Sequence, residues 1–230
     1  MKLGVMQPYF FPYFQQFRMI AQCDAWIAFD TVKYSRQAWI SRNRIINREK
    51  GWTWLSVPVT KGATAGSISE ARLAKGNWRK QVMDRLRVYE HEAPQYEEIR
   101  GIVAEGIATE AASIGELNSS CIRLFCRYLG IETAFHDLSK MGLPLPHKAA
   151  RGEWPLHICK AVGAQSYINA AGGRHLYDPA KFNAAGVSLE FYEPIDLKYE
   201  TGSFRFEPDL SIIDTLMWLP KQHLQALIRK

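Results

Sequence analysis

A basic stretch over residues 33–45 is the part of the sequence whose residue types are best suited to binding chemistry. Its charged residues, with no acid among them, are Lys33, Arg36, Arg42 and Arg44. Arginine guanidinium groups are planar and can donate two parallel hydrogen bonds to a phosphate or a carboxylate. Because Trp39, Ile40 and Ile45 interrupt the charges, the stretch is not expected to be fully solvated. We therefore expect a loop that binds an anionic ligand, the alternative being a solvated charged surface.

Asp30 precedes this stretch, at the end of an apolar run over residues 25–29. Nearby cations favour the charged form of a carboxyl group, so we expect Asp30 to stay ionised and to position a substrate amine or hydroxyl. It could instead cap the following turn. Arg42 and Arg44 are two residues apart, so they would face the same side of an extended segment, and Asn43 would face the other side.

An aromatic turn follows the first apolar run, with the sequence Met-Gln-Pro-Tyr-Phe-Phe-Pro-Tyr over residues 6–13. Pro8 and Pro12 restrict its backbone. Gln7, Tyr9 and Tyr13 carry polar ends that suit hydrogen bonding to a ligand and stacking on a flat or sugar ring. The alternative is that these rings fill space between a helix and a sheet.

Two further segments carry candidate site residues. Gly172 and Gly173 follow a predicted strand and would let the backbone approach a ligand, although neither phosphate-loop motif is present and a plain turn is the better explanation. His175 lies in the same turn and is a catalytic candidate beside Asp30. Asp214 lies on a late apolar helix, where it either faces the site or joins a helix start capped by Ser211 or Asp209. The histidines lack ligand spacing, so no metal site is expected.

Strand-like and helix-like patterns alternate along the chain, which predicts an α/β fold with a mainly parallel sheet flanked by helices. The predicted strands cover residues 3–6, 25–29, 52–59, 133–138, 166–170 and 187–192. The predicted helices cover residues 14–23, 78–92, 96–105, 113–129, 155–162, 211–219 and 221–228. Parallel sheets bind ligands beyond the carboxyl ends of their strands, near the point where strand order reverses. Asp30, the basic stretch and the glycine pair all follow strands, so they would open on one edge.

Length and composition favour one α/β domain over residues 1–230, with residues 76–130 as a helical, insertion-like segment. Apolar residues make up 47% and charged residues 23% of the chain, which are ordinary globular values. No apolar run reaches the roughly 18 residues of a membrane span, and no signal peptide is expected. The cysteines lack metal-ligand spacing and suit buried, reduced thiols. These features predict a cytoplasmic protein without a membrane partner.

The formal net charge of +6 favours an anionic partner. We do not expect a nucleic-acid partner, because the basic residues are dispersed and no recognised nucleic-acid module occurs. A phosphorylated small molecule fits the charge equally well. The sequence leaves the oligomeric state open.

Several segments together resemble the WbqC-like protein family. They are the aromatic turn over residues 6–13, the runs 29–34 and 39–44, Tyr89 with Ala93-Pro94, residues 158–160 with Gly163-Ala164, and residues 210–214. The resemblance spans nearly the whole chain. It implies an association with gene clusters for bacterial surface polysaccharide such as O-antigen, and a suggested role as a glycine transferase. The chain departs from the family pattern at residues 169–173 and 218–220.

The order of elements also looks like that of the nucleotidyltransferase superfamily that includes pantothenate synthetases. The H-x-G-H motif of those enzymes is absent, and residues 9–13 occupy its place. The likeness is therefore one of fold alone.

These observations predict transfer of an aminoacyl (glycyl) or acyl group to an amino sugar that is nucleotide-linked. A cofactor is not identified, and ATP is one option for activating the acyl group. The alternative is a non-catalytic protein that binds sugar nucleotides or glycans.

Overall fold

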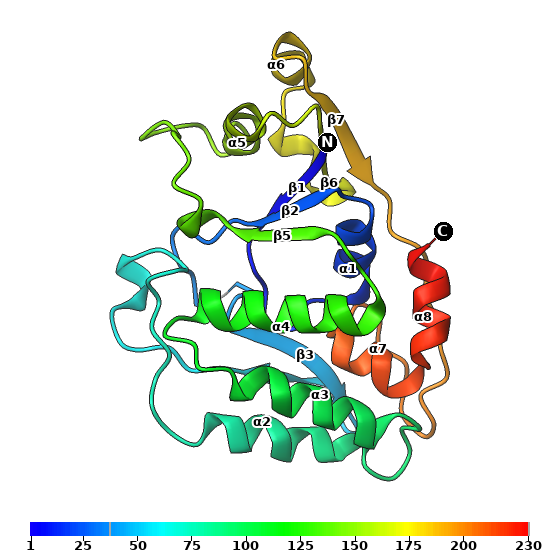
Figure 1. The fold of residues 1–230 in the computed structure, drawn as a ribbon. Coiled ribbons are helices and arrows are strands. Elements are labelled where there is room, and N and C mark those ends of the chain that lie inside the picture. Colours follow the sequence, from blue (N-terminus) through cyan, green and yellow to red (C-terminus); the bar gives the residue numbers. More distant parts are fainter. Residues whose placement is uncertain (37, 230) are drawn as a thin grey trace.

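The computed structural model describes residues 1–36 and 38–229, and a parallel β-sheet forms its centre (Figure 1). The strands of this sheet are β1 (Lys2–Met6), β2 (Ala25–Ala28), β5 (Ala134–Asp137), β6 (Ser166–Ala170) and β7 (Ser188–Tyr192). They lie in the order β5-β2-β1-β6-β7, and all the pairings between them are parallel. The predicted α/β class with a mainly parallel sheet is confirmed.

The strand order places a topological switch point at the centre of the sheet. Numbered along the chain within this sheet, the strands follow the order 3-2-1-4-5 that is common in doubly wound α/β folds. The chain moves outward from β1 through β2 to β5, and it later returns to the other side of β1 with β6. This arrangement is compatible with the nucleotidyltransferase-like expectation.

Helices cover both faces of the sheet, because its strands carry apolar side chains on both sides. Leu3, Val5 and Ile27 pack on one face with residues of α5 (Trp154–Val162) and α6 (Pro179–Ala184), while Trp26 packs on the other. Figure 1 shows α1 (Phe14–Ala21) and α4 (Ile114–Leu129) on that second side. The alternation of odd and even residues follows from the two-residue period of a strand.

The basic stretch is not wholly a loop, which corrects the prediction. Residues Arg42–Asn47 form β3, which pairs antiparallel with β4 (Gly51–Ser56) in a separate two-stranded sheet. The alternating burial of β3, with Asn43 and Ile45 inside, gives this segment the two-residue period of a strand. The predicted strand over residues 52–59 therefore belongs to this hairpin and not to the parallel sheet.

The middle of the chain is helical, as expected. It contains α2 (Trp78–Leu86), α3 (Tyr96–Ala108) and α4. Helix α4 begins where the Ser113 hydroxyl accepts a hydrogen bond from the Glu116 amide, and it ends at Gly130, whose φ is 71°. A serine N-cap and a glycine in the left-handed conformation at the C-terminus are both common at helix ends. Residues of these helices share one apolar cluster with Phe10, Phe11 and Phe17 from the start of the chain.

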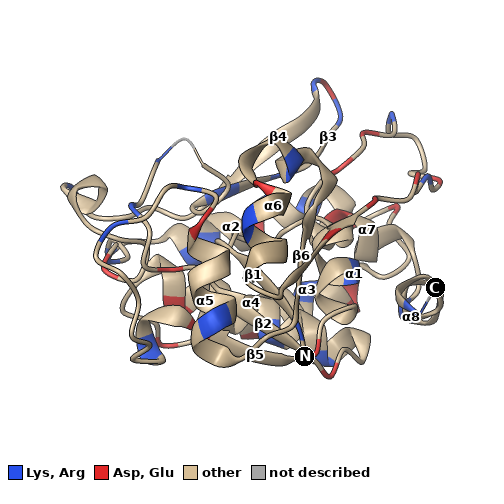
Figure 2. Ribbon diagram, turned by 90° about the horizontal axis from the view of Figure 1, so that it is seen from above, with Lys and Arg blue, Asp and Glu red and all other residues tan. Residues whose placement is uncertain are grey.

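The C-terminal part closes the fold with α7 (Ile212–Trp218) and α8 (Lys221–Ile228), and α6 is a helix that the sequence pattern did not indicate. Among the described residues, none of the helices combines the length and the apolar character of a membrane span. Cys23, Cys121, Cys126 and Cys159 are free and buried. Figure 2 shows basic and acidic residues interspersed over many elements, as the dispersed charges in the sequence suggested.

Candidate functional site

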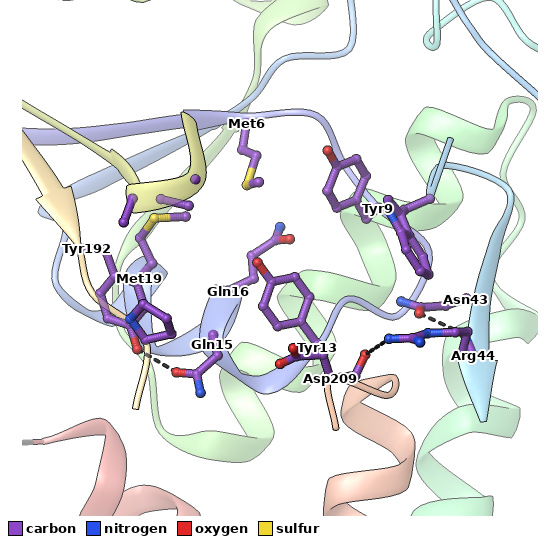
Figure 3. A pocket seen from close by; sticks show the side chains of 15 residues that line it. Met6, Tyr9, Tyr13, Gln15, Gln16, Met19, Asn43, Arg44, Tyr192 and Asp209 are labelled. Atoms are coloured by element: carbon purple, nitrogen blue, oxygen red, sulfur yellow. Dashed lines mark hydrogen bonds between the residues drawn. The ribbon is translucent and has the colours of Figure 1, made fainter. Parts of the chain in front are cut away.

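A cavity of about 450 Å³ opens at the switch point, beyond the carboxyl ends of β1, β6 and β7 (Figure 3). This is the place at which parallel α/β sheets generally bind ligands, and the volume is in the range of small-molecule pockets. It is lined by Met6, Tyr9, Tyr13, Gln15, Gln16, Met19, Trp39, Asn43, Arg44, Ala170, Ala171, Gly172, Tyr192, Pro194 and Asp209.

Two buried asparagines hold the aromatic turn that presents Tyr9 and Tyr13 to this cavity. Asn43 Nδ2 donates to the carbonyl oxygens of Phe10 and Phe11, at 3.0 and 2.8 Å. Asn118 Nδ2, from α4, donates to the carbonyls of Pro8 and Ile40, at 2.8 and 2.7 Å. The backbone of Phe11 has a φ of 41°, a region that non-glycine residues rarely adopt. Such a conformation persists only where its surroundings hold it, as these amides do.

The phenols of Tyr9 and Tyr13 are hydrogen-bond donors at neutral pH. Burial raises the pKa of Tyr9, although the charge of Arg151 acts in the opposite direction. Burial also raises the pKa of Tyr13, and the negative charge of Asp209 adds to that effect. Both rings therefore keep their protons and can donate to a ligand.

Arg44 provides the positive charge on the hairpin side of the cavity. Its guanidinium lies 5.4 Å from the ring centres of both Trp39 and Trp52, within the range of cation–π contacts. Its Nη2 donates to the carbonyl of Asp209 at 3.0 Å. Its buried Nε has no hydrogen-bond partner within the described part of the chain. A flat cation with a free donor is thus held in place by aromatic rings.

Arg42 and Arg44 share one side of β3, as their spacing predicted, and Asn43 faces the opposite way. Arg42 lies 4.2 Å above the ring of Trp54, next to the contacts of Arg44 with Trp39 and Trp52. The result is a surface of alternating indole and guanidinium groups. Arg44 and Trp39 line the cavity and Arg42 does not.

Gln15 and Gln16 are adjacent and buried, but the Gln15 side chain is hydrogen-bonded and the Gln16 side chain is not. Gln15 Nε2 donates to the Ile195 carbonyl at 2.7 Å, and its Oε1 accepts from the Tyr192 hydroxyl at 2.7 Å. Gln16 is 1% exposed, and neither its Oε1 nor its Nε2 has a hydrogen-bond partner among residues 1–36 and 38–229. Figure 3 shows the Gln16 amide pointing into the cavity below Met6.

Asp30 lies away from the cavity, against a part of the chain that is distant in sequence. Its two carboxylate oxygens accept hydrogen bonds from the amide and the hydroxyl of Ser139, at 2.9 and 2.5 Å. Burial raises the pKa of Asp30, while the Ser139 hydrogen bonds lower it by less. Burial and the contacts with Ser139, rather than Lys33, Arg36 or Arg42, account for this shift in the pKa of Asp30. Its carboxylate fixes the start of the Leu138–Lys140 turn.

The other predicted site residues divide between the cavity and its surroundings. Tyr9, Tyr13, Trp39, Asn43, Arg44 and Gly172 line the cavity together. Gln7 is half-buried, Lys33, Arg36 and His175 are exposed, and Gly173 lies beside Asn169; these five and Arg42 do not line it. A Cβ on Gly173 would approach Asn169 Oδ1 to 2.9 Å, so close packing explains this glycine.

Asp214 belongs to a buried cluster and not to the cavity. Its carboxylate accepts hydrogen bonds from the hydroxyls of Tyr89 and Tyr199, both at 2.7 Å. Ser211 Oγ accepts from the Ile213 amide, so Ser211 caps α7. Burial raises the pKa of Asp214 to about 6, although the tyrosine hydrogen bonds favour the charged form.

Sequence reasoning missed several cavity residues. Gln16 could have been found, because helical spacing places it with Tyr13 and Met19 on the apolar side of α1. Tyr192 ends the predicted strand over residues 187–192, so its place at the carboxyl end of a strand was the available signal. Pro194 and Asp209 carry no such signal, because they come from an irregular segment almost two hundred residues from the aromatic turn. No group of three or more potential metal ligands occurs in the part of the chain that the structure describes.

Comparison with known proteins agrees with the resemblance in the sequence. The chain is 27% identical over 222 residues to the uncharacterised protein Rv1507c of Mycobacterium tuberculosis, covering 94% of this chain and 92% of that protein. No solved structure matches the chain. The model of the WbqC-like protein family matches residues 7–226. The chain therefore belongs to the WbqC-like protein family.

Proposed function

We propose that the protein transfers an aminoacyl group, such as glycyl, or another acyl group to an amino group on a nucleotide-linked sugar. The family context of surface polysaccharide biosynthesis motivates the substrate class. The observation that carries the proposal is the combination of Arg44, Tyr9 and Tyr13 around one cavity at the switch point. A guanidinium with a free donor suits a phosphate, and phenol donors beside exposed indole surface suit a sugar ring.

In the proposed reaction, the amine nitrogen of the sugar attacks the carbonyl carbon of the activated acyl donor. A C–N bond forms, the bond from the carbonyl carbon to the leaving group breaks, and the leaving group takes the electron pair. The amine proton passes to a base or to solvent. Donors from Tyr9, Tyr13 and Arg44 would hold the reactants and stabilise developing negative charge. Both an acyl phosphate anhydride formed with ATP and a thioester can serve as this acyl donor, because each has a leaving group that accepts the electron pair.

Asp209 takes the role that sequence reasoning assigned to Asp30. Asp209 lines the cavity, whereas the Asp30 carboxylate lies outside it and accepts a hydrogen bond from the Ser139 hydroxyl. In this proposal, the Asp209 carboxylate orients the attacking amine beside Tyr13. His175 has no part in it.

Substitution of Arg44 tests the anion site. We expect Arg44→Gln to weaken binding of a nucleotide-linked amino sugar by about 10- to 100-fold, because a charge-assisted hydrogen bond is lost. Arg48→Gln is the matched control, since Arg48 follows the same strand but stacks on Phe204 and pairs with Glu92 outside the cavity. The measurement is product formation from the amino sugar with glycine and ATP, and separately with acyl thioesters.

Equal activity of Arg44→Gln and wild type, or no product with any donor and acceptor in the panel, contradicts the proposal. A second candidate function is non-catalytic binding of sugar nucleotides or glycans. The position of Asp30 and His175 outside the cavity favours it. Saturable ligand binding without turnover, weakened in Arg44→Gln, would select that candidate.

A further inference from the structure

The start of α1 carries two neighbouring glutamines, Gln15 and Gln16. Both are buried, both line the cavity, and they differ in their hydrogen bonds. The Gln15 carboxamide bonds to Ile195 and Tyr192, so its role is to connect α1 to the segment that follows β7. The Gln16 carboxamide has neither a donor nor an acceptor partner in the described part of the protein.

An unpaired buried carboxamide is unfavourable for folding, because both its donor and its acceptor lose water without compensation. Buried polar groups are nearly always satisfied, and an exception calls for an explanation such as a bound ligand, an ion or a water. Gln16 points into the cavity, and Figure 3 shows open space between its amide, Met6 and Tyr13. The partner is therefore expected to be part of the ligand.

The chemistry of a carboxamide restricts that partner. Oε1 accepts and Nε2 donates, side by side and in one plane. A nucleobase edge presents a donor and an acceptor next to one another and can engage both atoms, as glutamine does with adenine. A trans acetamido group directs its N–H and its carbonyl to opposite sides, so it can satisfy one atom only. Met6 and Met19 add the polarisable apolar surface that packs well against a flat ring.

We propose that Gln16 reads the hydrogen-bonding edge of a nucleobase at the inner end of the cavity. This inference rests on the proposed function in one respect, namely that the ligand is nucleotide-linked. It assigns an orientation to that ligand: the base lies against α1 beside Gln16, and the phosphates lie toward Arg44 on the opposite side. Figure 3 shows Gln16 and Arg44 on different walls of the cavity.

The first test uses wild-type protein and pairs of ligands. Calorimetry with AMP, UMP, CMP and GMP should identify one preferred base. The same nucleotide, methylated so that no N–H remains on the donating base nitrogen (dimethylated where that nitrogen is an exocyclic amine), should bind at least 10-fold more weakly, because its edge no longer complements the carboxamide. Equal binding of the methylated and unmethylated nucleotides, or binding of none of the four, overturns the inference.

The second test uses Gln16→Met, with Gln15→Met as the matched control. Without ligand, Gln16→Met should raise Tm by about 2–4 °C, because an unpaired buried amide is replaced by an apolar side chain of similar size. It should also abolish the distinction between the methylated and unmethylated nucleotides. Gln15→Met should lower Tm, because the Tyr192 hydroxyl and the Ile195 backbone lose their partner.

A fall in Tm for Gln16→Met together with unchanged base preference would mean that an internal water satisfies the amide, and would overturn the inference. Two other outcomes distinguish a failure of this inference from a failure of the proposed function. Base-selective binding that depends on Gln16, without turnover of any amino sugar, supports this inference and contradicts transfer. Turnover that is indifferent to the base contradicts this inference and supports transfer.

Discussion

At the residue scale, the buried acid Asp214 links three elements that are distant in the sequence. It lies on α7 and accepts hydrogen bonds from Tyr89, after α2, and from Tyr199, in the segment after β7. Tyr89 in turn accepts from the Ile46 amide on β3, at 3.2 Å. The acid therefore supports the hairpin that carries Arg44, although it does not line the cavity.

Asp214 should make stability depend on pH. Its folded pKa of about 6 lies above the ordinary 3.8, so the folded state binds more protons than the unfolded state between about pH 4 and pH 6. The contribution of this group to the free energy of unfolding is present below pH 4 and is lost as pH rises through 6. A shift of this size corresponds to about 3 kcal/mol.

Two substitutions separate the charge of Asp214 from its hydrogen bonds. Asp214→Asn should remove this group's contribution to the pH dependence of stability, whereas Asp214→Ala should cost about 2–4 kcal/mol at every pH, because two buried hydroxyls lose their acceptor. Urea denaturation at pH 4 to 7 measures both effects. Asp196→Asn, on the surface, is the control and should match wild type. An unchanged pH dependence in Asp214→Asn would rule out this account.

At the element scale, the indole of Trp26 on β2 packs over β1 because Gly4 has no side chain. A Cβ on Gly4 would lie 2.3 Å from Trp26 Cε3, and Trp26 is a large, fully buried residue of β2. The same central strand ends at Met6 and leads into the aromatic turn, so packing at Gly4 sets the position of one cavity wall. Helix α3 offers a contrast, because nothing lies within 4 Å of a Cβ on Gly101.

Alanine at these two glycines should have opposite effects on stability. Gly4→Ala should lower the free energy of unfolding by about 3 kcal/mol, because the added methyl group overpacks a rigid indole. Gly101→Ala should raise it by about 0.5–1 kcal/mol, since Gly101 lies in a helix interior and is exposed. Thermal denaturation of the two variants measures both. A stable Gly4→Ala protein would show that the Trp26 indole can move aside to accept the methyl group.

At the scale of the whole molecule, one apolar cluster joins the helical segment 76–130 to the sheet. It includes Phe17 of α1, Trp26 of β2, Val82 of α2, Val103 of α3 and Phe125 of α4. A second cluster lies on the other face of the sheet under α5 and α6. A segment that shares its core with the sheet has little apolar surface left with which to fold alone.

We accordingly predict that residues 1–230 unfold as one domain. Far-ultraviolet circular dichroism, which follows the helices, and tryptophan fluorescence should give a single, coincident transition in urea. A ligand of the cavity should move the whole transition to higher urea concentration. Two separate transitions, with the ligand acting on only one of them, would show that the helical segment is an independent unit.

The sequence by itself determined the features that depend on local chemistry. Apolar runs predicted strands at residues 3–6, 25–29 and 166–170, and the apolar spacing over residues 113–129 predicted the helix that forms α4. Strand periodicity placed Arg42 and Arg44 on one side, and the alternation of strands and helices predicted the parallel sheet and the edge at which the cavity opens. These signals act over a few residues, so they can be read without coordinates.

Only the tertiary structure decided which of the candidate residues meet. Asp30 is near Lys33 and Arg36 in sequence, but its partner in space is Ser139. Gln16, Tyr192 and Asp209 come together because β6 and β7 return beside β1 and the last segment crosses the aromatic turn. Neighbours along the chain constrain periodicity and capping, whereas burial and hydrogen bonding depend on contacts between distant segments. The composition of the cavity was therefore fixed by the packing of the sheet.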